Sequence, residues 1–217
     1  MRVFGRVVSY ILLPVTLVLS VIGFWHCLLD SYLDFKQYVW VGIGMIVCLL
    51  LGLLLRKNKL ILQTFAHEGA HAIVGLMFMK KINRIQVNAS GNGFVEHHGG
   101  HNIFITLAPY CFTYLTYLML LVRTLIMPQY LYIIDILVGL TFLFHLSCFM
   151  SQTRNYQPDI LFFGLVRSYM FIFTFLFFNF SIIIYSIRVN LWPAFTIFFH
   201  DLWNNIVWCY SFLVNVF

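Results

Sequence analysis

Residues 60–79 read LILQTFAHEGAHAIVGLMFM, and they carry an H-E-x-x-H pattern at His67, Glu68 and His71. Glu68 is the only charged side chain in this stretch, and about 20 such residues make a helix long enough to cross a hydrocarbon core. On a helix, residues four apart share a face, so both imidazoles can reach one metal ion while Glu68 stands beside the water that the ion carries. The stretch therefore predicts a zinc site with its own general base at membrane depth.

Chance is a poor explanation for this pattern. The 217 residues hold eight His and, in the printed sequence, only Glu68 and Glu96 as glutamates. An accidental match is then expected about three times in a thousand such chains, and a glutamate at membrane depth is costly unless it has a use. The alternative is a pair of polar histidines that bond across helices with Glu68 as a partner. That alternative leaves the spacing unexplained.

The composition predicts an all-α polytopic membrane protein. Hydrophobic residues make up 62% of the chain, charged residues 9%, and the mean hydropathy is +0.91, values outside the range of soluble globular domains. The longest stretch without an expected span, residues 80–100, is too short to hold a core of its own. We therefore expect residues 1–217 to form a single membrane-embedded domain, integral to the membrane with several passes.

Hydropathy predicts six or seven transmembrane helices. The six clearer spans are residues 7–29, 38–55, 60–79, 101–122, 131–151 and 160–187. A final aromatic segment, residues 194–216, either crosses the bilayer or lies in its interface. The net charge of +6 comes from basic side chains scattered among the loops, which favours contact with the lipid bilayer and not with nucleic acid. The sequence favours no oligomeric state.

Residues 82–95 predict a small β-hairpin between the third and fourth spans. Ile82, Ile85 and Val87 precede a turn rich in Asn and Gly, and Phe94 and Val95 follow it. A plain polar loop is the alternative. A hairpin here would offer an edge strand that can bind an extended peptide by strand addition.

Catalytic zinc usually has three protein ligands, so His67 and His71 need a partner. Asp159 is the preferred candidate, because it follows Pro158 at the start of an expected span, and because an even number of crossings puts residues 80–100 and 153–158 on the same face of the membrane. The alternative is that Asp159 binds no metal and only begins a helix at the membrane interface. The other candidate ligands are Asp135, His145 and His101, whereas His97 and His98 are expected to face water.

From residue 60 to about residue 165 the chain resembles the site-2 protease family of intramembrane zinc metalloproteases, in its short form without an attached soluble domain. The H-E-x-x-H helix, the small β segment, the span opening with Ala108-Pro109, and a later carboxylate carry the resemblance. It implies Zn²⁺ on His67, His71 and Asp159, with Glu68 as the catalytic base.

The resemblance also implies the substrate, a membrane protein whose transmembrane helix unwinds locally and is cleaved in or near the membrane. The second motif departs from the family pattern Asn-x-x-Pro-x-x-Leu-Asp-Gly, because Asp159 follows Pro158 directly and precedes Ile160, and Asn155 is only an approximate counterpart of the family's asparagine. Three other functions stay open: a membrane zinc hydrolase acting on lipid, a catalytically inactive relative, and a transporter or channel. The last is disfavoured because intramembrane charge is sparse and no repeat is visible.

Overall fold

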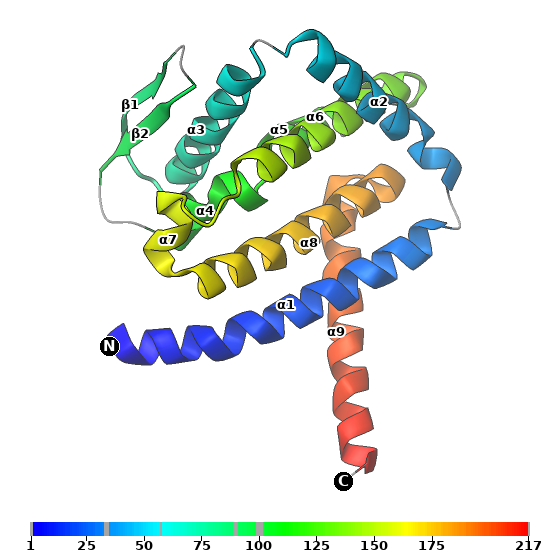
Figure 1. Cartoon of the computed structure of the whole chain (residues 1–217). Helices are drawn as coiled ribbons and strands as arrows, with labels where there is room; N and C mark the ends of the chain where they lie inside the picture. The colour runs from blue at the N-terminus through cyan, green and yellow to red at the C-terminus, as the bar shows by residue number, and fades with distance from the viewer. Residues whose placement is uncertain (1, 33–34, 57, 89–90, 99–101, 217) are drawn as a thin grey trace.

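The structure is a computed structural model that describes residues 2–32, 35–56, 58–88, 91–98 and 102–216, and for residues 2–10, 32, 97, 209 and 212–216 the backbone alone. Helices dominate it (Figure 1). In chain order the elements are α1 (Arg2–Tyr32), η1 (Phe35–Tyr38), α2 (Val39–Leu54), α3 (Lys59–Met77), β1 (Ile82–Val87), β2 (Gly93–His97), α4 (Ile103–Cys111), α5 (Tyr114–Arg123), η2 (Pro128–Tyr130), α6 (Leu131–Gln152), α7 (Pro158–Phe163), α8 (Leu165–Val189) and α9 (Leu191–Val216).

Within the described residues, four helical segments are long and apolar enough to cross a membrane. They are Ile11–Ser31, Phe35–Leu54, Pro128–Gln152 and Leu165–Val189. A fifth candidate is the pair α4 and α5, which is bent by 74°. The prediction of an all-α membrane fold agrees with these helices, whereas the predicted count of six or seven spans is not confirmed.

The two expected spans that are not among these candidates are residues 60–79 and 194–216. The first corresponds to α3, whose polar side chains Gln63, Thr64 and Glu68 are buried against the protein. The second corresponds to α9, which carries His200 and Asp201 near its middle. Both helices therefore form where the sequence predicts them, but their polar side chains lower their hydropathy below that of the other spans.

The predicted hairpin is confirmed. Strands β1 and β2 pair antiparallel, with Ile85 opposite Val95 and Val87 opposite Gly93, and the register shifts between Ile82 and Arg84. The backbone of Asn88 donates to the carbonyl of Asn92 and closes the turn. Figure 1 shows the hairpin beside α3 at one end of the molecule.

Glycines bring α2 and α6 into backbone contact. A Cβ at Gly44 would overlap the carbonyl oxygen of Ile136, and a Cβ at Gly139 would overlap that of Val41. Small residues allow such close approach between helices in membranes, where lipid tails offer no hydrophobic drive for association. The α2–α6 pair consequently fixes the position of α6, and α6 ends beside α3.

The break between α4 and α5 follows from the local backbone. Phe112 ends α4 in an extended conformation, with φ −97° and ψ 108°, and Thr113 precedes the first turn of α5. Pro109 lies inside α4 and lacks the N–H that would bond to the carbonyl of Ile105 four residues earlier. The expected span at residues 101–122 is therefore two half-helices, and the first of them ends inside the protein.

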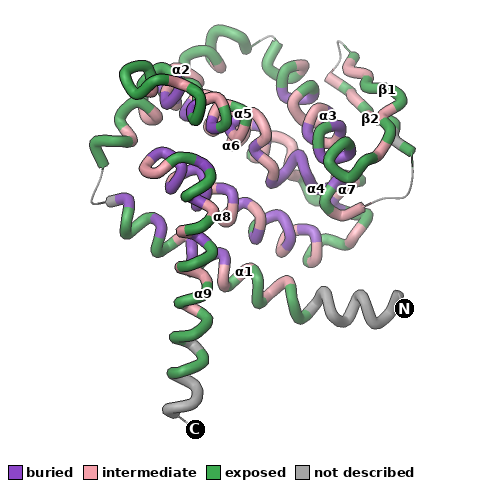
Figure 2. Tube along the Cα trace, turned by 180° about the vertical axis from the view of Figure 1, so that it is seen from behind, coloured by how far each residue is buried: buried purple, intermediate pink, exposed green. Residues whose placement is uncertain are grey.

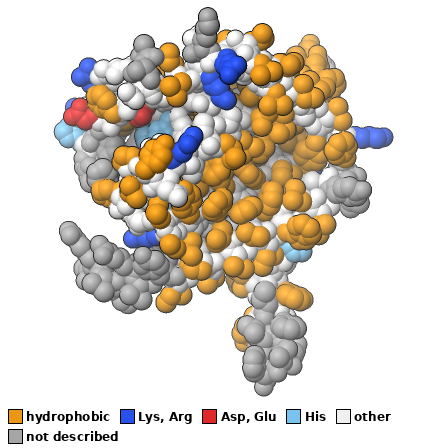
Figure 3. Space-filling model, in the orientation of Figure 1, with side chains coloured by type: hydrophobic (Ala, Val, Ile, Leu, Met, Phe, Trp, Pro, Cys, Tyr) orange, Lys and Arg blue, Asp and Glu red, His pale blue; other side chains and the backbone are white. Residues whose placement is uncertain are grey.

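The buried side chains gather where α4, α6 and α8 meet, as the purple segments in Figure 2 show. Helices α1 and α2 expose large apolar side chains such as Ile11, Trp25, Leu53 and Leu54. Figure 3 shows hydrophobic side chains covering most of one face of the molecule, with few charged groups among them. Together with the apolar helices, this surface suits a protein embedded in lipid.

Candidate metal centre

Helix α3 holds His67, Glu68 and His71 in one turn, as their spacing predicts. The imidazole centroids of His67 and His71 lie 5.0 Å apart. The side chain of His67 is 11% exposed and that of His71 14%, while Glu68 as a residue is 7% exposed. The motif thus faces a cleft inside the protein and not the lipid.

Asp159 meets the two histidines from α7. Its Oδ2 atom lies 3.5 Å from His67 Nε2 and 3.4 Å from His71 Nε2. Among the described His, Cys, Asp and Glu residues, these three form the one group whose ligand atoms all lie within 4.8 Å of one another. The third ligand candidate favoured by the sequence is therefore the one that the fold brings to His67 and His71.

The separations within this group fit a metal ion. Zinc binds imidazole nitrogen and carboxylate oxygen at about 2.0–2.2 Å in a tetrahedron, so neighbouring ligand atoms lie about 3.3 Å apart. A charge-assisted N–H···O bond is shorter, about 2.7–2.9 Å. The contacts of 3.4 and 3.5 Å are close to the edge of a zinc tetrahedron and too long for strong direct bonds. Two imidazoles and one carboxylate are also a ligand set that zinc favours.

His71 is oriented by a carbonyl that Pro109 leaves free. The Nδ1 atom of His71 donates to the carbonyl oxygen of Ile105 at 2.8 Å. In a regular helix that oxygen would accept from the N–H of residue 109, and proline has none. A neutral His71 ring with its proton on Nδ1 would leave Nε2, the ring atom 3.4 Å from Asp159 Oδ2, available to a metal ion.

His67 and Asp159 have supporting contacts of the same kind. The Nδ1 atom of His67 lies 3.1 Å from Oε1 of Gln152, the last residue of α6. The hydroxyl of Tyr110, a residue that is 1% exposed, donates to Asp159 Oδ2 at 3.3 Å. The ring of Tyr110 also packs edge-on against His67. Each member of the group is thus held by a partner from another helix.

The hairpin holds Glu68 from the other side. A Cβ at Gly93 would lie 2.7 Å from Glu68 Cγ and 2.9 Å from its Oε1, so β2 approaches the carboxylate closely only because residue 93 is glycine. The Thr64 hydroxyl donates to the carbonyl of Gly91 at 2.8 Å and anchors the turn on α3. The position of Glu68 is consequently coupled to that of β2.

Two clefts open on either side of Glu68. One, of about 390 Å³, lies between the turn of the hairpin and the connection from α6 to α7. The other, of about 310 Å³, lies between Phe94 and Val95 of β2 and Pro158 and Asp159 of α7. His67 and Glu68 line both clefts, so a chain threaded through them would pass over the motif.

The acidity of Asp159 reflects these neighbours. Helix α7 lies outside the candidate spans. Burial raises the pKa of the Asp159 carboxyl, but its contacts with His67 and His71 outweigh burial and hold that pKa below its ordinary value. Asp159 is therefore ionised at neutral pH, which suits a ligand for a cation.

The other candidate ligands lie elsewhere. Asp135 accepts from Arg123 Nε at 2.7 Å and belongs to a separate ion pair. His145 lines a small cavity beside His67, its Nε2 has no hydrogen-bond partner among the described residues, and it does not join the metal group. His101 lies outside the described residues. His98 is exposed, and of His97 only the backbone is described.

Sequence reasoning missed Gln152, Tyr110 and the role of Pro109. No motif marks Gln152 or Tyr110, because their relation to the histidines arises from the packing of α4 and α6 against α3. The signal for Pro109 was present as a proline in a helix, but only the fold shows that Ile105 faces His71. Asn155, the approximate counterpart of the family's asparagine, instead accepts from the Tyr169 hydroxyl at 2.7 Å.

Comparison with known proteins gives a family match. No curated protein and no solved structure matches the chain. A model of the Peptidase M50B-like family matches residues 39–192, well over half of the 217 residues, and the match contains His67, Glu68, His71 and Asp159. The chain belongs to the Peptidase M50B-like family, as its resemblance to the site-2 proteases predicts.

Proposed function

We propose that this chain is a multi-pass intramembrane zinc metalloprotease, which hydrolyses a peptide bond in or near the transmembrane segment of a membrane-protein substrate. The observation that carries the proposal is the meeting of His67, His71 and Asp159, with each histidine Nε2 about one edge of a zinc tetrahedron from the Asp159 carboxylate and Glu68 beside them. Membership of a peptidase family supports a metallopeptidase in general. The surrounding apolar helices support a reaction within the membrane.

In this proposal His67 and His71 hold zinc through Nε2, and Asp159 through its carboxylate. Bound zinc supplies a Lewis acid that polarises a carbonyl and makes water a stronger acid. Gln152, Ile105 and Tyr110 fix the three ligands through the contacts described above. Such partners of metal ligands set the ring orientation and tautomer, and they change metal affinity when lost.

Glu68 is the proposed general base. It is next to His67 on the same helical turn, and Gly93 limits where its carboxylate can lie. Glu68 takes a proton from the attacking water and passes it to the nitrogen of the leaving amine, so that the carboxylate is restored at the end of the reaction. A general base or acid placed in this way contributes about 10²–10⁴ to the rate.

The substrate is proposed to bind as an extended strand. A helical segment hides its carbonyls in its own hydrogen bonds, so it must unwind before water can attack. In the part of the chain that the structure describes, β2 pairs with β1 on one edge alone, and Gly93, Phe94 and Val95 of β2 line the cleft that contains His71 and Asp159. Strand addition to that edge would present a scissile carbonyl to the motif.

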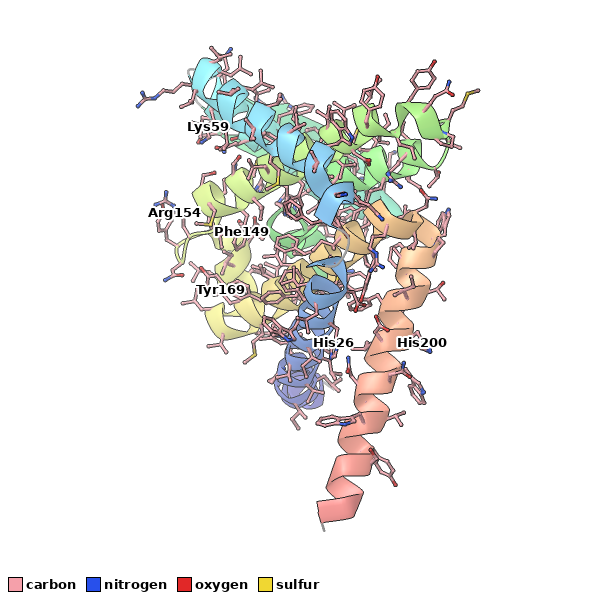
Figure 4. The ribbon with its side chains drawn as sticks, turned by 90° about the vertical axis from the view of Figure 1, so that its right-hand side faces the viewer. His26, Lys59, Phe149, Arg154, Tyr169 and His200 are labelled. Carbon is pink, nitrogen blue, oxygen red and sulfur yellow. The ribbon has the colours of Figure 1, made fainter. Side chains whose placement is uncertain are left out.

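The test uses purified protein reconstituted with single-span model substrates, with cleavage products and free fatty acids measured in the same vesicles. Glu68→Gln should keep about one zinc per chain while proteolysis falls about 10²–10⁴-fold. His71→Ala should lose zinc, and the matched control His26→Ala should keep it. His26 is exposed on α1, and Figure 4 shows it apart from Lys59 at the start of α3.

Two results would overturn the proposal. Proteolysis by Glu68→Gln at the wild-type rate would remove the proposed base. Release of fatty acid that depends on Glu68, without any peptide product, would instead favour the membrane lipid hydrolase.

A further inference from the structure

Helix α9 is placed unlike the other long helices. It is 26 residues long, yet the part of it that the structure describes is not among the candidate spans. Figures 1, 2 and 4 show it running across α1 and α8 and projecting from the bundle. Asn190 ends α8 with φ 71°, a left-handed conformation that turns the chain, and its Oδ1 accepts from Arg123 Nη1 at 2.7 Å. The turn at Asn190, held by its hydrogen bond with Arg123, therefore sets the transverse direction of α9.

One side of α9 packs on the bundle. Leu191, Ala194 and Phe198 are buried, and a Cβ at Gly23 of α1 would lie 3.0 Å from the Phe198 ring. Asp201 lies next to this packed side of α9. The Tyr185 hydroxyl of α8 donates to Asp201 Oδ2 at 2.8 Å and lies 3.4 Å from Asp30 Oδ2 of α1.

The rest of α9 carries two stripes. At about 100° per residue, six exposed or half-exposed apolar side chains fall within one sector. This outer stripe consists of Trp192, Phe199, Trp203, Ile206, Val207 and Tyr210. The polar stripe, about 100° away around the axis, consists of His200, Asn204 and Ser211. His200 is 71% exposed and projects from the helix in Figure 4, whereas Trp208 falls outside both stripes.

The contacts with α1 show which stripe lies deeper. Phe198 of α9 packs against Gly23 of α1, whereas Asp201 contacts the Tyr185 hydroxyl, which also lies beside Asp30 of α1. Asp30 is seven residues after Gly23 and therefore roughly 10 Å nearer to the end of the candidate span Ile11–Ser31. Going around the axis of α9 from Phe198 in one direction, Asp201 comes first and the polar stripe next. In the other direction from Phe198 comes the outer stripe. The polar stripe therefore points to the membrane surface and the outer stripe to the hydrocarbon.

We infer that α9 lies in the plane of the membrane interface, with its outer stripe in the acyl region and its polar stripe in water or head groups. Trp and Tyr favour this zone because their rings are apolar with one polar atom. An amphipathic helix with an aromatic apolar face binds there. A crossing orientation would instead place His200, Asp201 and Asn204 at the centre of the hydrocarbon, where polar side chains are costly.

The experiment compares pairs of adjacent residues on α9. If α9 crosses the bilayer, the two members of a pair lie at nearly the same depth. If α9 lies flat, one member faces the hydrocarbon and the other faces water or head groups. The pairs are Phe199→Cys with His200→Cys, Trp203→Cys with Asn204→Cys, and Tyr210→Cys with Ser211→Cys. All six side chains are exposed in the structure, so protein alone protects none of them. Each variant in membrane vesicles is labelled with a membrane-impermeant maleimide, with wild type as the background and SDS-unfolded protein as the measure of full reactivity.

The polar member of every pair should label about tenfold faster than its outer-stripe neighbour, from the same side of the vesicle at all three positions along α9. Labelling that depends on position along α9 and is equal within pairs would show a crossing helix. Equal and fast labelling of all six would show a helix in water, and absence of labelling at all six would show one buried on every side. Each of these three results overturns the inference.

Discussion

Asp135 and Asp159 both lie among apolar helices, but they are neutralised in different ways. Arg123 Nε donates to Asp135 Oδ1 at 2.7 Å, and the same guanidinium donates to the carbonyls of Ser186 and Ile187 at the end of α8. Asp159 contacts His67, His71 and the hydroxyl of Tyr110. In the part of the chain that the structure describes, no Lys or Arg pairs with Asp159.

The difference separates a structural charge from a functional one. A buried carboxylate needs a compensating charge, and Arg123 supplies it within the protein for Asp135. Asp159, with Glu68 nearby, has only imidazoles, which are neutral when they serve as ligands. In the proposed metal site, a divalent ion would supply the compensating positive charge. The same residue type therefore lies in an ion pair at a helix junction in one place and in the proposed metal site in the other.

The largest expected effect follows from removing the functional charge. Asp159→Asn should lower zinc affinity by more than the roughly 100-fold seen when a partner of a metal ligand is lost, since a ligand itself is weakened. Metal-free protein should lose less stability than Asp135→Asn protein, because Asp159→Asn weakens the contacts with His67 and His71 but leaves no buried cation without a partner. Zinc competition with a chelator and thermal unfolding without metal measure the two quantities. Wild-type zinc affinity in this variant would remove Asp159 from the metal site.

Removing the structural charge should have the opposite pattern. Asp135→Asn leaves Arg123 buried without a counter-charge and should lower the free energy of unfolding by about 3–5 kcal/mol, while the folded fraction still binds zinc. The double variant Arg123→Met/Asp135→Leu should recover most of that loss. Unfolding in mixed micelles gives both values. If the double variant is as unstable as the single one, the ion pair is not the cause.

Pro109→Ala should change stability and zinc affinity in opposite directions. Alanine restores an N–H that competes with His71 for the carbonyl of Ile105, so α4 gains a hydrogen bond and zinc affinity falls about tenfold. Pro14→Ala is the matched control, because Pro14 also lies inside a helix, α1, away from the metal group. Equal zinc affinity in the two proline variants would show that the freed carbonyl does not orient His71.

The smallest effect is expected for Tyr110→Phe. Its hydroxyl makes one bond to the ionised Asp159, and because that bond is long at 3.3 Å its loss should weaken zinc binding only about 2–10-fold, less than the loss of a short hydrogen bond to a charged group. Tyr117→Phe is the control, because the Tyr117 hydroxyl donates to Asn179, outside the metal group. Competition with a chelator is sensitive enough to separate the two. A change of the same size in both variants would indicate a general loss of packing.

Much of the site could be predicted because its chemistry is local. The spacing of His67, Glu68 and His71 requires only a helix, and Pro158 marks the helix start that places Asp159. Sequence alone left Asp135, His145 and His101 open beside Asp159, since the choice depends on which helix ends meet. Arg123 could not be paired with Asp135 from the pattern, because their contact is set by the α5–α6 turn and the end of α8.

The fold was predictable to a similar extent. The helices and the hairpin follow from hydropathy and from the Asn/Gly turn, and Gly93 and Val95 pair where a hairpin requires. The break after Cys111 was not predicted, and the sequence left open whether residues 194–216 cross the bilayer or lie in its interface. The break and the direction of α9 both depend on tertiary contacts, of Phe112 and Thr113 within the bundle and of Asn190 with Arg123, which hydropathy does not record.

The most direct test of the metal site is an experimental structure of zinc-loaded Glu68→Gln protein, with anomalous scattering recorded on both sides of the zinc absorption edge. The account predicts one peak within about 2.0–2.2 Å of His67 Nε2, His71 Nε2 and a carboxylate oxygen of Asp159, and none at Asp135. A zinc peak coordinated by His145 or Asp135 in place of Asp159, or full zinc loading with no peak at His67 and His71, would contradict it.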